Sequence, residues 1–128
     1  MGLKDSLRLM VVDDMSVSRG LLTQALEEIG RMKYQTENDG RAAFAKLAAQ
    51  PVHLVLSDYN MPNMDGLGLL EALRRNKSTQ SVGFILVTGN PTREAVEKGR
   101  ALGLNNMIKK PFTSSALKQC IEQVVGKL

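Results

Sequence analysis

Short apolar runs recur along the chain, and each is separated from the next by a longer segment of mixed character. The apolar runs lie at residues 8–12, 54–57, 83–87 and 106–109, and a short, more polar second strand is expected at about residues 33–37. Such short, nearly continuous runs are typical of strands buried on both faces. Apolar residues recur at helical spacing between and after them, at about residues 16–29, 42–48, 66–73, 92–102 and 117–128. Five alternations of this kind predict an α/β fold with a parallel sheet and right-handed crossovers.

The predicted helices begin and end at residues with known boundary preferences. Gly30 ends the first helix, Asn38-Asp39-Gly40 turns the chain into the second, and Pro51 requires the second to stop before it. Asp65-Gly66 begins the third, after which residues 74–77 are expected to lead into solvent. The fourth has a narrow apolar face, and the interior Gly99 costs about 1 kcal/mol relative to alanine. We therefore expect the fourth helix to be the least stable.

Polar side chains follow four of the apolar runs. Asp13 and Asp14 follow the first predicted strand, Asp58 the third, Thr88 the fourth and Lys110 the fifth. Ligands of open α/β sheets bind where the carboxyl ends of the strands meet, so we expect these side chains to converge there. Carboxylates, a hydroxyl and an amine at one edge suit a divalent cation and a phosphoryl group.

The three aspartates suggest a division of roles. Asp58 is the predicted nucleophile, because a carboxylate that attacks phosphorus forms a mixed anhydride. The attack joins two anions and needs a cation, for which Asp13 and Asp14 supply oxygen ligands of the kind that Mg²⁺ prefers. The backbone carbonyl of Asn60 is a further candidate ligand. Alternatively, Asp58 forms only a turn or cap, and one of the acidic pair caps the first helix in competition with Ser16.

Thr88 and Lys110 complete the predicted phosphoryl site. A lysine ammonium acts on a phosphoryl oxygen as a point charge, and a threonine hydroxyl can donate a hydrogen bond to another. Only one residue of the pair Lys109-Lys110 can point inward at the end of the strand, and the following Pro111 favours Lys110. The alternative for Lys110 is an ordinary surface lysine.

Taken together, these residues resemble the receiver domain of two-component response regulators, and the resemblance covers almost the whole chain. Receivers carry an acidic pair after the first strand, the phosphorylated aspartate after the third, Ser or Thr after the fourth and Lys-Pro after the fifth. Residues 58–66, DYNMPNMDG, are very close to the family's third-strand signature. The resemblance implies a doubly wound, five-stranded parallel sheet, (βα)5 with strand order 2-1-3-4-5, and a cis Lys110-Pro111 bond.

Among receivers, the chain is most similar to stand-alone CheY-like chemotaxis regulators of the alphaproteobacterial type. This resemblance implies that residues 1–128 form one receiver domain without an output domain. It implies a monomeric phosphoacceptor protein rather than an enzyme, with Mg²⁺ as its cofactor. A CheA-like histidine kinase would donate the phosphoryl group to Asp58, and a phosphatase is a further possible partner. The signal would pass to the flagellar motor switch protein through the face formed by the fourth helix, fifth strand and fifth helix.

Two positions depart from the CheY pattern. Met107 stands where such receivers usually carry the Tyr or Phe that rotates together with the Thr, here Thr88, and Asn90 stands where relatives often carry an acid. Met107 puts the aromatic switch in doubt. A second hypothesis is therefore a phosphate sink, which drains a shared kinase without binding an output target. A phosphatase of the haloacid dehalogenase kind is disfavoured, because that family needs an Asp-x-Asp motif after its first strand.

Composition and charge narrow the possible partners. The net charge is +4 and the pI is about 9.4. Residues 1–90 contain ten basic and ten acidic residues, whereas residues 91–128 contain seven basic and three acidic ones, so the excess lies in the last third. Nucleic-acid binding is disfavoured because no DNA motif, basic run or aromatic platform accompanies this charge. A solvated basic surface and a docking face for an acidic protein both remain open.

The sequence also bears on the cellular compartment. No apolar stretch approaches the roughly 18 residues of a membrane span, and residues 1–6 lack the apolar core of a signal peptide. A single cysteine cannot form an internal disulfide. The expected location is the cytoplasm.

Overall fold

The computed structural model describes residues 6–30 and 33–128. The prediction that the N-terminus lacks a signal peptide concerns mainly residues 1–5, which lie outside the described residues. In the described ranges, strands and helices alternate as predicted. The third and fourth strands each extend one residue beyond prediction, to Asp58 and Thr88. The fourth helix is one residue shorter at each end, and the last helix ends at Val125 rather than at Leu128. The elements are β1 (Arg8–Val12), α1 (Ser16–Ile29), β2 (Lys33–Glu37), α2 (Gly40–Ala49), β3 (Leu54–Asp58), α3 (Gly66–Arg75), β4 (Gly83–Thr88), α4 (Arg93–Ala101), β5 (Asn106–Lys109) and α5 (Ser114–Val125).

All strand pairs in the sheet are parallel, and the strand order is β2-β1-β3-β4-β5, which confirms the predicted fold class. β3 lies at the centre, between β1 and β4. The register pairs Val12 with Ser57, Asp58 with Val87, and Thr88 with Lys109. The last residues of these strands are thus brought to one edge of the sheet.

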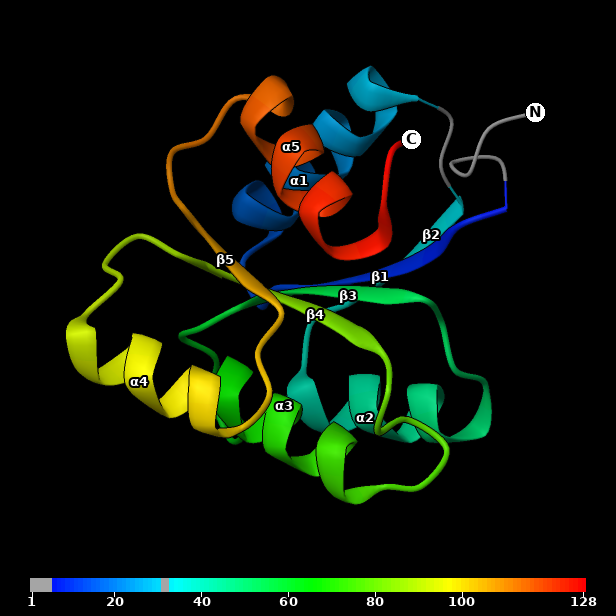
Figure 1. The fold of residues 1–128 in the computed structure, drawn as a ribbon, viewed down its shortest axis with the longest axis vertical. Coiled ribbons are helices and arrows are strands. Elements are labelled where there is room, and N and C mark those ends of the chain that lie inside the picture. The colour runs from blue at the N-terminus through cyan, green and yellow to red at the C-terminus, as the bar shows by residue number, and fades with distance from the viewer. Residues whose placement is uncertain (1–5, 31–32) are drawn as a thin grey trace.

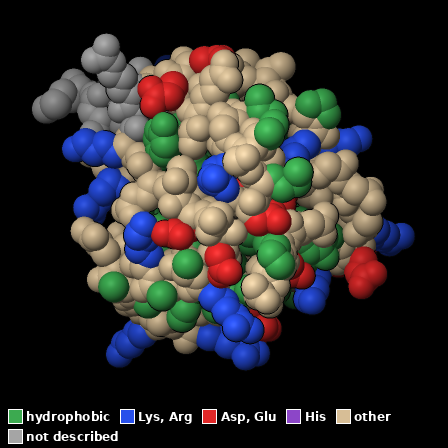
Figure 2. Space-filling view, turned by 180° about the vertical axis from the view of Figure 1, so that it is seen from behind, with side chains coloured by type: hydrophobic (Ala, Val, Ile, Leu, Met, Phe, Trp, Pro, Cys, Tyr) green, Lys and Arg blue, Asp and Glu red, His purple; other side chains and the backbone are tan. Residues whose placement is uncertain are grey.

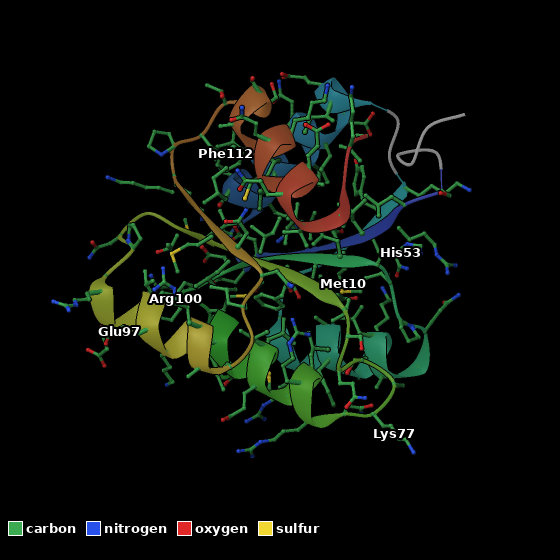
Figure 3. All side chains as sticks on the ribbon, in the orientation of Figure 1. Met10, His53, Lys77, Glu97, Arg100 and Phe112 are labelled. Atoms are coloured by element: carbon green, nitrogen blue, oxygen red, sulfur yellow. The ribbon has the colours of Figure 1, made fainter. Side chains whose placement is uncertain are left out.

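Helices cover both faces of the sheet, with α1 and α5 on one side and α2, α3 and α4 on the other (Figure 1). Successive strand residues point to opposite faces, so each strand contributes to two apolar cores. Leu9, Leu56 and Val87 belong to the core beneath α1 and α5. Met10 and Leu86 belong to the core beneath α2 and α3, and Figure 3 shows Met10 directed to that side.

Four helices begin with a side-chain cap, and α1 does not. The side chains of Asp39, Asp65, Thr92 and Thr113 accept hydrogen bonds from backbone N–H groups in the first turns of α2, α3, α4 and α5. The N-cap residue of α1 is Met15, which makes no side-chain cap hydrogen bond. The alternative prediction that an acidic residue or Ser16 caps α1 is therefore wrong.

Gly99 has a packing role in α4 that the sequence did not suggest. It is buried, and a Cβ atom built on it would lie 2.8 Å from Leu104 Cδ2. The missing side chain lets the segment after α4 pack against the helix. The low stability expected for α4 stays a prediction.

Arg74 corrects the expectation that residues 74–77 lead straight into solvent. Its half-buried guanidinium donates hydrogen bonds to the carbonyls of Val82 at 2.7 Å and Gly103 at 2.9 Å, and to Asn105 Oδ1 at 2.9 Å. Burial lowers the pKa of this group. Arg74 thereby fastens the end of α3 to the loops before β4 and β5.

Charged side chains of both signs are interspersed over the face seen in Figure 2. That face therefore offers no broad surface of a single sign to a polyanion. In the described ranges, no helix combines the length and apolar character that crossing a bilayer requires.

Candidate functional site

Asp13 lies directly after β1 and is fully buried. Its backbone N–H donates to the Glu37 carbonyl at 3.0 Å, and its Oδ1 accepts from the Met15 N–H at 3.0 Å. Arg19 Nη1 donates to the Asp13 carbonyl at 2.8 Å. Contacts from β2 and α1 therefore hold the backbone of Asp13, and the Met15 N–H holds one of its carboxylate oxygens.

Asp58 is the last residue of β3 and is 7% exposed. The following residue, Tyr59, donates its N–H to the Val87 carbonyl at 3.1 Å and accepts from the Gly66 N–H at 2.8 Å. A Cβ atom on Gly66 would lie 2.5 Å from the Asp58 carbonyl oxygen. Glycine is therefore required where α3 begins, because only a bare backbone can approach the strand end so closely.

Asp13, Asp14 and Asp58 form one acidic cluster, in which one carboxylate oxygen from each lies within 4.8 Å of the others. Asp13 Oδ2 and Asp14 Oδ1 are buried and have no hydrogen-bond partner among the described residues. Buried polar atoms are normally paired, and carboxylates in particular are costly to leave without a partner. A hard cation ligated by oxygen would satisfy these atoms, so the residues fit Mg²⁺.

Lys110 supplies the positive charge at this edge. Its Nζ lies 2.8 Å from Asp58 Oδ1 and 3.5 Å from Asp13 Oδ2, and it donates to Ser18 Oγ at 2.7 Å. Its backbone N–H donates to the Thr88 carbonyl at 2.8 Å, and the Lys110-Pro111 bond is cis, as the resemblance implied. Lys109, by contrast, is exposed. The structure thus brings Lys110 into the site.

Opposing influences act on the Asp58 carboxyl group. Burial raises its pKa above the ordinary value, and the negative charge of Asp13 acts in the same direction. The hydrogen bond from Lys110, its charge, and the Tyr59 N–H act to lower the pKa, and the net shift is upward. Without a cation, the ionised form is therefore disfavoured.

The other predicted site residues lie around this centre. Thr88 ends β4, is buried, and accepts from the Asn90 N–H at 3.2 Å through its Oγ1. Asn60 is exposed in the loop after β3, and its carbonyl as a metal ligand stays a prediction. Met107 is half-buried on β5 and packs against the core beneath α2 and α3. Its role as a switch also stays a prediction.

The sequence interpretation missed Ser18 and Arg19. Both lie in the first turns of α1, away from the apolar stripe formed by Leu22, Ala25 and Leu26. Hydrophobic periodicity carries no signal for such positions. The available clue was a pair of polar residues at the start of a helix that directly follows two aspartates.

Comparison with known proteins agrees with this arrangement. Residues 9–122 match the family model of the response regulator receiver domain. The chain is a response regulator receiver. A Rhizobium etli protein named "Probable chemotaxis protein CheY" is 40% identical to this receiver over 128 residues, covering 100% of the chain and 99% of the relative.

Two Vibrio cholerae proteins extend the comparison. Chemotaxis protein CheY-3 is 29% identical over 126 residues, covering 98% of this receiver and 97% of the relative. The crystal structure of chemotaxis protein CheY4 at pH 4.0 superposes with a TM-score of 0.85 at 27% identity, covering 92% of this receiver and 98% of that chain. The receiver is therefore a CheY-like protein of two-component signalling, a regulator rather than a conventional enzyme.

Proposed function

We propose that this receiver accepts a phosphoryl group on Asp58 from a CheA-like histidine kinase and acts in chemotaxis. The observation that carries the proposal is the contact of 2.8 Å between Lys110 Nζ and Asp58 Oδ1 inside the acidic cluster. The name of the 40% identical relative supports the assignment to chemotaxis. We take residues 1–128 to act as one cytoplasmic, monomeric domain, with a phosphatase as a further partner.

The chemistry follows from the positions of the side chains. A carboxylate oxygen of Asp58 attacks the phosphorus atom, and the bond from phosphorus to the donor's histidine nitrogen breaks. The leaving nitrogen keeps the electron pair, and Asp58 becomes a mixed anhydride. Lys110 stabilises the negative charge on the phosphoryl oxygens, and the Thr88 hydroxyl donates to one of them.

Asp13, Asp14, Asp58 and the Asn60 carbonyl would hold Mg²⁺. When bound, this cation offsets the repulsion between the carboxylate and the incoming phosphoryl group. Two buried oxygens, Asp13 Oδ2 and Asp14 Oδ1, lack a hydrogen-bond partner among the described residues and support this assignment.

We propose the face formed by α4, β5 and α5 as the output surface, with the flagellar motor switch protein as its partner. This face carries the excess of positive charge found in residues 91–128, and Figure 3 shows Glu97 and Arg100 projecting from α4. Thr88 and Met107 would link it to the phosphorylation site, because they lie on the neighbouring strands β4 and β5.

A phosphate sink is the second candidate function, and Met107 is the observation that favours it. Methionine has several rotamers of similar energy, so it separates two conformations less sharply than an aromatic ring does. A receiver with a weak switch can still drain phosphoryl groups from a shared kinase. Binding of purified motor switch protein, with and without an acyl-phosphate mimic, separates the two. Phosphorylation-dependent binding supports the motor role, and no binding in either state supports the sink.

The nucleophile is tested by substituting Asp58→Asn. We expect labelling by phosphorylated kinase or acetyl phosphate to be abolished, because an amide is a far poorer nucleophile than a carboxylate. Asp39→Asn is the matched control, since it makes the same chemical change at the cap of α2, and it should label normally. Undiminished labelling of Asp58→Asn would reject the assignment.

A further inference from the structure

The Lys110 ammonium lies against three oxygen-bearing side chains. Two are the carboxylates of Asp58 and Asp13, at 2.8 and 3.5 Å. The third is the hydroxyl of Ser18, whose Oγ lies 2.7 Å from Nζ although 92 residues separate the two side chains in sequence. Asp58 and Ser18 accept hydrogen bonds from two of the three N–H donors of the ammonium, and Asp13 adds an ion pair.

Ser18 is a firmly placed acceptor. It lies in the first turns of α1, a helix anchored by the buried side chains of Leu22 and Leu26 and by the Arg19 guanidinium on the Asp13 carbonyl. The Lys110 side chain, in contrast, has four rotatable bonds and is 28% exposed. The firmly placed Ser18 hydroxyl therefore restricts the conformations of the flexible Lys110 side chain.

The chemistry of a hydroxyl also suits this position. A carboxylate in place of Ser18 would neutralise much of the positive charge of the ammonium. That charge is needed to interact with the phosphoryl oxygens. A neutral oxygen orients the ammonium and leaves its charge available. During phosphorylation Asp58 Oδ1 becomes part of the new anhydride, so Ser18 is an acceptor that does not react.

A cavity of about 670 Å³ beside Lys110 offers space for other rotamers of the lysine side chain. Ser18, Leu21, Phe112 and Thr113 line it, together with the carboxylate-bearing Glu28. Figure 3 shows Phe112 on the side of the sheet covered by α1 and α5. Without the Ser18 hydroxyl, rotamers directed into this cavity compete with the one that reaches Asp58.

We propose that Ser18 is a positioning residue for phosphoryl transfer, holding the Lys110 ammonium beside Asp58. This inference rests on the proposed function, because it concerns the same site. Ser18 acts through Lys110 and touches neither the acidic cluster nor the phosphoryl group in the role assigned to it.

The first experiment compares Ser18→Ala, Ser18→Thr and Ser16→Ala in labelling by acetyl phosphate at saturating Mg²⁺. Asp58 attacks the phosphorus atom and acetate leaves, so no kinase docking is involved. Ser18→Ala should label about three- to tenfold more slowly, the range expected from one hydrogen bond. Ser18→Thr keeps the hydroxyl and should restore the rate to within about twofold. Ser16 is exposed on the same helix, and its replacement should leave the rate unchanged.

Two further measurements distinguish positioning from a structural role. Mg²⁺ affinity, measured by calorimetry, should be the same in Ser18→Ala and the wild type, whereas a distorted site would weaken it. The substitution is then repeated in a Lys110→Ala background, where it should have no further effect on the labelling rate. An equal loss of rate in both backgrounds, or a Ser18→Ala protein as fast as the wild type, would overturn the inference.

The labelling measurements distinguish a failure of this inference from a failure of the proposed function. If the wild type is not labelled, or if Asp58→Asn is labelled, the proposed function fails. If labelling depends on Asp58 while Ser18→Ala labels at the wild-type rate, only the role of Ser18 fails.

Discussion

Neutralising Asp14 should stabilise the protein in the absence of metal. Its carboxylate has an oxygen within 4.8 Å of oxygens of Asp13 and Asp58, and its buried Oδ1 has no hydrogen-bond partner among the described residues. Lys110 contacts Asp13 and Asp58, and the ion pairs found in the described ranges assign no cation to Asp14. Asp14→Asn removes the repulsion and adds N–H donors for the neighbouring carboxylates.

The magnitude follows from Coulomb's law. At 4.8 Å, two like unit charges repel by about 0.9 kcal/mol in water and about 3.5 kcal/mol at an effective dielectric constant of 20. Lys110 cancels about one of the two charges that Asp14 faces. Because Asp14 is half-buried, the lower part of this range applies, and we expect a gain of about 1–2 kcal/mol. For 128 residues, that corresponds to a rise in Tm of about 4–8 °C.

The assay is thermal unfolding followed by circular dichroism at low salt, first with a chelator and then with Mg²⁺. The wild type should gain about 1.4 kcal/mol at a Mg²⁺ concentration ten times Kd, and Asp14→Asn should gain much less. Asp39→Asn is the matched control, because asparagine caps a helix as well as aspartate does. A lower or unchanged Tm for metal-free Asp14→Asn would refute the electrostatic reasoning. A wild-type Tm insensitive to millimolar Mg²⁺ would refute the metal site itself.

Three further predictions concern packing, reactivity and switching. Gly66→Ala should lower the free energy of unfolding, measured by chemical denaturation, by about 2 kcal/mol or more, because the new Cβ would meet the Asp58 backbone. Gly20→Ala is the control: Gly20 has open space around it, so this substitution should raise the free energy of unfolding by about 0.5–1 kcal/mol. Burial raises the pKa of Cys120 to about 11, so at pH 8 its thiol should react with a disulfide reagent about 100-fold more slowly than an exposed cysteine. In the unfolded protein the same thiol should react at the rate of an exposed cysteine. Met107→Tyr should widen the difference in affinity for an output partner between the two phospho-states; an unchanged ratio in binding titrations would mean that this position does not carry the switch.

Local signals were sufficient to predict the alternation of strands and helices, whereas the strand order was implied by the resemblance to receivers. The apolar runs of β3 and β4 are long enough to identify buried strands, and the turn at Asn38-Asp39-Gly40 and the proline at 51 bound α2. The convergence of Asp13, Asp58 and Lys110 followed from topology alone, since parallel strands end at one edge of the sheet.

The rest depended on how elements lie against one another. The contact between Ser18 and Lys110 requires the direction of α1 relative to the end of β5, which no local pattern encodes. Gly99 was interpreted by its helix propensity, whereas the structure shows that contact with Leu104 decides its role. Arg74 was expected to lead into solvent, although the loops before β4 and β5 both supply acceptors for it.

At the N-terminus of α1, helix stability and the chemistry of the neighbouring site make different demands on one residue. Every other helix in the described ranges starts with a capping side chain, whereas α1 starts at Met15, beside the acidic cluster. A serine or aspartate there would contribute about 1 kcal/mol to the helix, so a library selected only for thermal stability should accumulate cap-forming residues at position 15. A library selected for signalling should resist them, because a new hydrogen-bonding group would stand at the rim of the phosphoryl site. The residue recovered at position 15 would therefore distinguish the two kinds of selection.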